Sequence, residues 1–173
     1  MKLGLLSAAM VFAASTAVAQ HAHQSDSPSE TGQSQFAAIA EIVTMLRDDP
    51  ETDWARVDIK ALRDHLVDMD NVTTKASVDR AVDGLSVTFS VKGDEVVAGS
   101  IRRMVLAHSR MLQGSSDWAV TAAEQDGGAT VLVQVGSNEE LNQVLGLGFF
   151  GLMVIGAHHQ QHHFMIATGK SPH

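Results

Sequence analysis

A pattern that occurs twice restricts the fold of this chain more than any other feature: two alternating segments flank a turn, and a helical segment follows. In the first copy, residues 72–78 and 85–91 alternate between apolar and polar side chains around Asp83 and Gly84. Such alternation around Asp-Gly is typical of a β-hairpin with one solvated face. Residues 95–112 then have helical spacing. The first copy therefore predicts a β-hairpin followed by a helix.

The second copy has the same order, so the chain contains an internal repeat. Residues 118–123 and 130–135 alternate around Asp126-Gly127-Gly128, and a long helical segment runs from about residue 138 to about residue 167. Two such units most simply form one antiparallel sheet with helices on one face. If the repeat is structural, the helix over residues 95–112 and the last helix should pack side by side in equivalent places.

Two helices are expected before the first hairpin. Apolar residues recur at helical spacing over about residues 35–46 and again over about residues 57–68. Asp48-Asp49-Pro50 ends the first helix, and Asp53 is a candidate N-cap of the second. The predicted fold class is α+β, with two N-terminal helices followed by two β-hairpin-plus-helix units that form one four-stranded antiparallel sheet with helices packed on one face.

The first 19 residues have the pattern of a cleaved export signal. Lys2 precedes an apolar stretch from Leu3 to Ala14, and Ala17-Val18-Ala19 is the small-residue pattern before a cleavage site. A bilayer span needs about 20 apolar residues, and no segment of the chain is that long. We therefore expect a periplasmic or secreted protein, without a membrane span, after signal-peptide cleavage.

The expected signal peptide, residues 1–19, leaves three further parts. Residues 20–35 are polar and without apolar periodicity, so we expect a disordered leader. Residues 36–168 should form a single α+β metal-binding domain, and residues 169–173 a C-terminal tail. His21 and His23 lie in the leader and are candidates for N-terminal metal capture, although a plain linker is the preferred interpretation.

The chain contains no cysteine. Exported proteins often rely on disulfides, so this one must be stabilised by a hydrophobic core. The absence of cysteine also excludes thiol catalysis, cysteine-ligated zinc, iron–sulfur clusters and covalently attached haem. The formal net charge is −8, which argues against nucleic-acid binding because that affinity comes from Lys and Arg neutralising phosphates. A metal ion must therefore be held by His, Met, Asp or Glu.

Histidine and methionine recur at one spacing in the two helices that follow the hairpins. Positions i, i+4 and i+7 of a helix lie on one stripe. The two stripes consist of Met104, His108 and Met111, and of His158, His162 and Met165. The second N-terminal helix adds His65 and Met69, also one turn apart. We expect these residues to face a shared interior and to form one metal site.

The run from His158 to His163 contains two pairs of histidines at i, i+4, and each pair can chelate one metal. His158 pairs with His162, and His159 with His163. This is the paired-histidine spacing of the zinc-protease helix, but Gln replaces the Glu that would act as general base, so hydrolysis is not expected. His159 and His163 lie about 100° to 140° around the helix from His158 and are either solvated or a second site.

The ligand types favour copper in its Cu(I) state. Thioether sulfur binds Cu(I) well and competes poorly for zinc, calcium or magnesium, whereas imidazole suits copper, zinc, iron and nickel. We therefore expect a copper chaperone or a protein for storage, buffering, delivery or resistance, and not an enzyme. Against this stands the ordinary role of methionine as core filler and of a single inward histidine as a hydrogen-bonded core residue.

Other functions are compatible with the same residues. His and Met are also axial ligands of b-type haem, for which residues 145–155 could line a pocket. A zinc or iron enzyme with histidine ligands would need a placed acid or base, and Asp64 and Asp68, which flank His65, are expected to face solvent. A metal-free interaction domain is the fourth reading. Besides the metal ion, the candidate partners are an exported protein that delivers or receives it and a second copy of the chain in a homodimer.

Overall fold

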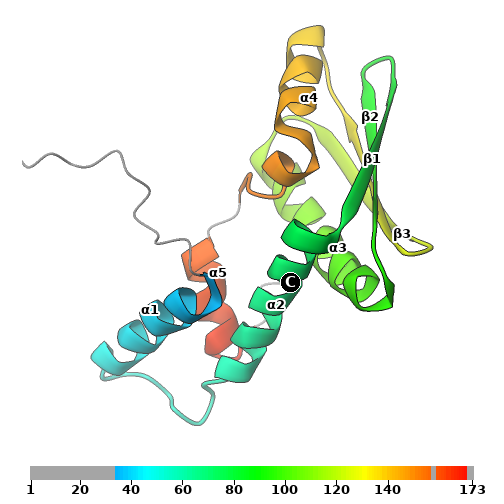
Figure 1. The fold of residues 1–173 in the computed structure, drawn as a ribbon. Coiled ribbons are helices and arrows are strands. Elements are labelled where there is room, and N and C mark those ends of the chain that lie inside the picture. The colour runs from blue at the N-terminus through cyan, green and yellow to red at the C-terminus, as the bar shows by residue number, and fades with distance from the viewer. Residues whose placement is uncertain (1–33, 157–158, 171–173) are drawn as a thin grey trace, which may run out of the picture. The chain divides into compact units, whose positions relative to one another are not determined.

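The computed structural model describes residues 34–156 and 159–170, which belong to one compact unit spanning residues 32–173 (Figure 1). The expected signal peptide and nearly all of the polar leader lie outside the described residues. The elements are α1 (Ser34–Asp48), α2 (Ile59–Lys75), β1 (Ser77–Asp83), β2 (Ser86–Lys92), α3 (Glu95–Ser115), β3 (Ala119–Gln125), β4 (Gly128–Gln134), α4 (Asn138–Leu152) and α5 (His159–Ala167). The predicted α+β fold class is confirmed. None of the described helices is long and apolar enough to cross a membrane.

The four strands form one antiparallel sheet in the order β1-β2-β4-β3. Both hairpins turn at a glycine in the left-handed region, with φ of 55° at Gly84 and 73° at Gly127. Other residues rarely adopt this conformation, which explains the Asp-Gly signal in both copies. Phe89 of β2 lies opposite Val131 of β4, and both side chains are buried. One face of the two central strands is therefore apolar.

The first strand begins later than its pattern predicts. Residues 72–75 continue α2, and β1 starts at Ser77. Val72 is buried in the core, while the hydroxyls of Thr73 and Thr74 donate to backbone carbonyls one turn earlier, at 2.9 and 2.6 Å. The β-branched residues favour a strand locally, but burial and these hydrogen bonds are compatible with helix, and tertiary packing decides.

Helices α3 and α4 pack on the apolar face of the sheet. Asp94 caps α3 by accepting a hydrogen bond from the Val97 N–H at 3.0 Å, and the Ser137 hydroxyl accepts one from Glu140 N–H at 3.2 Å at the start of α4. Burying each large apolar side chain contributes about 1.5–3 kcal/mol. The helix residues buried in this sheet core are Val97, Ile101, Val105, Leu112, Val144, Phe149 and Leu152.

The single long helix predicted over residues 138–167 is wrong. Helix α4 is kinked at Gly148 (φ 59°, ψ −175°), and the chain turns again at Gly156 (φ 71°). A Cβ atom at Gly156 would lie 2.2 Å from the Ser115 hydroxyl, so glycine also permits the close approach of this turn to the end of α3. After the break α5 packs against α1 and α2. The predicted equivalence of α3 and the last helix is therefore wrong, because α4 accompanies α3 on the sheet.

Helices α1, α2 and α5 form a second packing cluster, the helical cluster (Figure 1). The Asp58 N–H donates to the Ala167 carbonyl at 2.8 Å and ties the start of α2 to the end of α5. Asp58, and not Asp53, caps α2 by accepting a hydrogen bond from the Ala61 N–H at 2.9 Å. The buried apolar residues of this cluster are Ile42, Leu46, Leu62, Leu66 and Ala167.

Helix α2 belongs to both clusters. Its first half carries Leu62 and Leu66 in the helical cluster, whereas Val72 lies in the sheet core. The buried Asn71 amide donates to the Ser100 hydroxyl of α3 at 3.0 Å. Any group on the middle of α2 is therefore held between the two clusters.

Candidate metal centre

Three histidines approach one another where α2 packs against α5. The ring centroid of His65 lies 4.8 Å from that of His162 and 5.7 Å from that of His163, and the two α5 rings are 6.4 Å apart. The interplanar angles are 50°, 68° and 62°, so the rings are tilted or edge-on and not stacked. The fold thus brings together imidazoles from two segments that are far apart in the sequence. We call His65, His162 and His163 the histidine cluster.

Packing around α5 fixes the two later histidines. His163 is 5% exposed, Ala167 one turn further is fully buried, and Phe164 packs against the helical cluster. Gly169, at φ 66°, follows the helix, and its N–H donates to the Ile166 carbonyl at 3.0 Å. A helix of 9 residues is marginal in water by itself. The contacts with α1 and α2 therefore hold the histidines of α5 in place.

His65 lies at the edge of the apolar face of α2, as its spacing predicts. Leu62 and Leu66, on either side of it, are buried in the helical cluster. Met69, one turn after His65, packs against the same cluster. His65 itself is partly exposed, so the histidine cluster combines a buried ring with rings that solvent reaches.

The spacing of the three rings is close to that of imidazoles on one metal ion. A metal–nitrogen distance of about 2.0 Å puts each ring centroid roughly 3.2 Å from the ion, and rings at roughly 109° to 120° are then about 5.2 to 5.5 Å apart. The three observed distances bracket this range. Within residues 34–156 and 159–170, no three His, Asp or Glu side chains are already placed to hold an ion. Binding therefore requires the rings to turn and the two α5 histidines to approach by about 1 Å.

Two of the candidate methionines, Met69 and Met104, pack in different clusters. Met69 accompanies His65 along α2, and the partly buried Met165 follows His162 by three residues on α5. Met104 packs against the sheet core instead, and Met111, on the same helix, is partly buried. Met69 is thus a candidate thioether that packs in the helical cluster, and Met165 is a candidate by its place on α5.

His108 also lies in the sheet core. Its Nε2 is 3.1 Å from the Leu152 carbonyl oxygen, and the side chain is buried. This hydrogen bond joins α3 to the end of α4. His108 therefore has the ordinary role of a single inward histidine, which is that of a hydrogen-bonded core residue. The single site predicted to unite the stripe of His108 with that of His162 is therefore divided between two separate packing clusters.

The structure does not describe every residue of the predicted site. His158, His21 and His23 lie outside the described residues, and of His159 only its place at the start of α5 is described. His163 was expected to be either solvated or part of a second site, and its burial excludes the first of these.

Asp68 is a charged neighbour of the histidine cluster that the sequence reading placed in solvent. Its Oδ2 accepts a hydrogen bond from Arg103 Nε at 2.7 Å, and its Oδ1 accepts from Arg103 Nη2 at 2.6 Å and from the Ser100 hydroxyl at 2.8 Å. Burial raises the pKa of Asp68, but the hydrogen bonds from Arg103 and Ser100 and the charges of Arg103 and His65 lower it more, so it lies below its ordinary value. A fixed negative charge therefore stands one turn from His65.

Asp64, directly before His65, behaves as expected. It pairs with Lys60 at 2.5 Å and with Arg63 at 3.0 Å, and 45% of its side chain is exposed. Hydrogen bonds from Lys60 and then Arg63 lower the pKa of Asp64. The i, i+3 spacing of His65 and Asp68 was visible in the sequence, but the Arg103 partner on α3 was not. Only that partner distinguishes Asp68 from Asp64.

The donor atoms decide what this centre can do. Neutral imidazoles bind copper, zinc, iron and nickel, and an added thioether favours Cu(I). An anchored carboxylate near a ligand offsets part of the positive charge of a bound ion. No protein-family model, curated protein or solved structure matches the chain.

Proposed function

We propose that this is an exported metal-binding protein that holds copper, as Cu(I), with the imidazoles of His65, His162 and His163. The observation that carries the proposal is the mutual approach of three rings from two helices, at 4.8, 5.7 and 6.4 Å. Two of the imidazoles, those of His162 and His163, belong to neighbouring residues of α5, and the third, that of His65, comes from a different element. The proposed role is storage, buffering or delivery of the ion.

The choice of Cu(I) over zinc rests on sulfur. Met69 lies one turn from His65 and packs in the helical cluster, and Met165 lies three residues after His162. Three neutral nitrogens and a thioether are a soft, uncharged ligand set, which suits a monovalent ion better than a divalent one. Zinc remains the natural competitor for the imidazoles alone, so comparing the two ions tests the contribution of sulfur.

A binding role fits the surroundings better than catalysis. A hydrolytic metal enzyme needs a group that takes or gives a proton near the bound water. Asp68, the α2 carboxylate one turn after His65, already accepts three hydrogen bonds from Arg103 and Ser100. It is thereby suited to balance the charge of a bound ion, not to transfer protons.

The experiment is a competition titration of the metal-free mature protein. Cu(I) is titrated anaerobically against bicinchoninate, and Zn(II) against a chromophoric chelator. We expect one equivalent of each to bind, with Cu(I) held more tightly. The variants His65→Gln and His162→Gln should weaken both ions, whereas the control variant His21→Gln with His23→Gln should leave this equivalent unchanged.

Two outcomes would contradict the proposal. Absence of saturable Cu(I) binding would remove the copper function. A Soret band after addition of haem, lost in His65→Gln, would assign these histidines to haem b instead. The metal content of the protein taken from its native compartment, with an intact mass that lacks residues 1–19, tests the export part of the proposal.

A further inference from the structure

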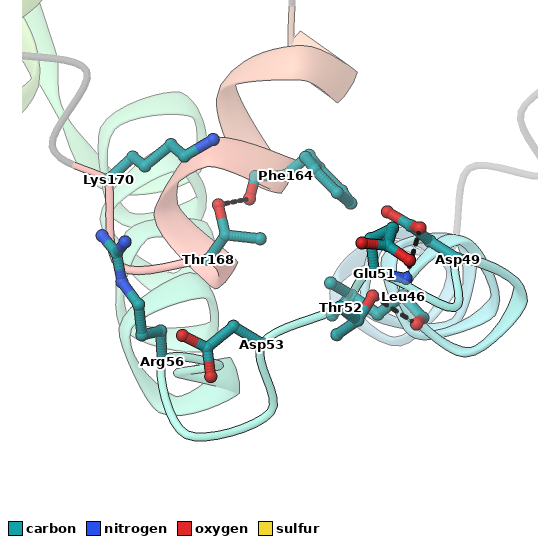
Figure 2. A pocket seen from close by; sticks show the side chains of 9 residues that line it. All are labelled: Leu46, Asp49, Glu51, Thr52, Asp53, Arg56, Phe164, Thr168 and Lys170. Carbon is teal, nitrogen blue, oxygen red and sulfur yellow. Dashed lines mark hydrogen bonds between the residues drawn. The ribbon is translucent and has the colours of Figure 1, made fainter.

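A pocket of about 210 Å³ lies between the α1–α2 connection and α5. Residues from the end of α1, from the connection over residues 49–56 and from the end of α5 line it (Figure 2). At about 30 Å³ per water molecule, this volume has room for a molecule of several heavy atoms. It is smaller than the roughly 300 to 1,000 Å³ of a drug-sized site. The pocket is therefore of the right size for a small metabolite.

Charges of opposite sign line opposite sides of this pocket. Figure 2 shows Arg56 and Lys170 on one side, and Asp49 and Glu51 on the other. A Cβ atom on Gly169 would lie 3.1 Å from the Arg56 carbonyl oxygen, so the chain entering Lys170 runs against Arg56. The ion pairs of the described residues involve none of these four side chains. The two sides are thus separated and do not neutralise each other.

Local hydrogen bonds fix the shape of the acidic side. Asp49 Oδ1 accepts from the Glu51 N–H at 2.9 Å, and the Thr52 hydroxyl donates to the Leu46 carbonyl at 2.7 Å. Asp53, which Figure 2 shows beside Arg56 and apart from Asp49 and Glu51, accepts a hydrogen bond at its Oδ1 from the Ala55 N–H at 3.1 Å. Each aspartate keeps its second carboxylate oxygen for other partners. These bonds hold the backbone of the connection and one oxygen of the Asp49 carboxylate, whereas the Glu51 side chain is exposed.

An apolar surface joins the two sides. The ring of Phe164 lines the pocket between the basic and the acidic groups in Figure 2. An aromatic face attracts both methylene groups and ammonium ions. A ligand that crosses the pocket would lay its uncharged middle on this ring.

We infer that this pocket binds a small zwitterion of the amino-acid class. Its carboxylate lies at Arg56 and Lys170, its ammonium group lies at Asp49 and Glu51, and its methylene chain packs on Phe164. A simple anion would pair with Arg56 and Lys170 but not with the carboxylates on the other side. A simple cation would pair with the carboxylates but not with Arg56 and Lys170. Only a molecule with both charges forms charge-assisted hydrogen bonds on both sides.

The test is an NMR titration of the mature, metal-free protein, followed on backbone amides. The probes are glycine, β-alanine, γ-aminobutyrate and ε-aminocaproate, which differ in the separation of their charges. Butyrate and butylamine carry one charge each and serve as matched controls. We expect saturable shifts over residues 49–56 and 164–170 with at least one zwitterion, and binding at least tenfold weaker for both controls. Equal binding of a singly charged control, or no saturable shift with any zwitterion, would overturn the inference.

Variants test the assignment of the two sides. Glu51→Gln and Lys170→Met keep side-chain size while removing one charge, and both positions are exposed, so the fold should persist. We expect each to weaken zwitterion binding at least tenfold. The controls Glu139→Gln and Lys92→Met remove equivalent exposed charges outside the pocket and should change nothing. If Glu51→Gln and Lys170→Met bind the zwitterion like the wild type, the pocket does not recognise it in this way.

Discussion

His65 of α2 and His162 of α5 lie with their ring centroids 4.8 Å apart, and only the folded helical cluster brings them together. A metal ion that uses both rings binds the folded state and has no equivalent site in the unfolded chain. Its binding free energy is therefore also folding free energy. Affinity and stability should consequently change together when either histidine is replaced.

The first prediction is a double-mutant cycle on this pair. His65→Gln and His162→Gln should each lower Cu(I) affinity by more than the roughly 10- to 100-fold that follows loss of a supporting residue. The double variant should lose less than the product of the two single losses, because the pair acts on one ion. Competition with bicinchoninate measures all three. If His65→Gln binds as the wild type does while His162→Gln fails, the site is an i, i+4 chelate on the last helix.

The second prediction separates the methionines. Met69→Leu should lower Cu(I) affinity and leave Zn(II) affinity nearly unchanged, because a thioether competes poorly for zinc. Met104→Leu should change neither affinity, since Met104 packs in the sheet core. Leucine for methionine conserves volume, so both variants should unfold within about 1.5 kcal/mol of the wild type. Equal Cu(I) affinities of the two variants would mean that Met69 only fills the core, and the preference for copper would then rest on Met165 alone.

Local signals in the sequence were sufficient for the sheet. The Asp-Gly turns at Gly84 and Gly127 and the alternation around Phe89 and Val131 specify hairpins within a few residues, so the α+β class follows. The start of β1 was misplaced because Val72 and its neighbours favour strand locally, whereas burial against the sheet core keeps them helical. Tertiary packing decides between strand and helix for these residues, and a local sequence pattern carries no information about that packing.

The candidate site was only partly predictable. His65, His162 and His163 were all identified, but their grouping with His108 assumed one continuous last helix. A helical pattern tolerates an isolated glycine, so neither Gly148 nor Gly156 predicts a break in the helix. The sequence pattern therefore does not show that α5 packs away from the sheet. The Asp68–Arg103 pair joins two helices, and the sequence around either residue does not predict which residue it contacts.

The third prediction concerns Asp68 and its matched control Asp64. Asp68→Asn removes the anchored negative charge one turn after His65 and should weaken Cu(I) binding about tenfold, within the range for groups that support a ligand. Asp64→Asn removes an exposed charge directly before His65 and should change affinity much less, because solvent screens it. Both are measured by the same competition titration. Similar losses in the two variants would attribute the effect to net charge and not to the position of Asp68.

The fourth prediction is the acid dependence of stability. The folded pKa of Asp68 lies below its ordinary value of about 3.9. The pair with Arg103 therefore stabilises the fold above about pH 4, and this contribution disappears as the pH falls through the lower, folded pKa. Arg103 is 63% exposed, so the contribution should be about 1 kcal/mol or less. Urea unfolding of metal-free protein at about pH 7, 4 and 2.5 should show a steeper loss for the wild type than for Asp68→Asn. Parallel curves would mean that the pair does not contribute.

The last prediction is that copper protects α5 more than any other element. This helix has 9 residues, is the last helix of the described residues and depends on α1 and α2 for its packing, so it should open at a lower free energy than the sheet core. Free Cu(I) at 100 times its Kd stabilises the bound form by about 2.7 kcal/mol. Amide exchange over residues 159–167 should therefore slow by up to about 100-fold when Cu(I) is added, while exchange in β2 and β4 changes less. His65→Gln should abolish the protection although the substitution lies on α2, because the ion then loses its link between the helices. If α5 remains protected by Cu(I) in His65→Gln, the ion is held by α5 alone and does not join the two helices.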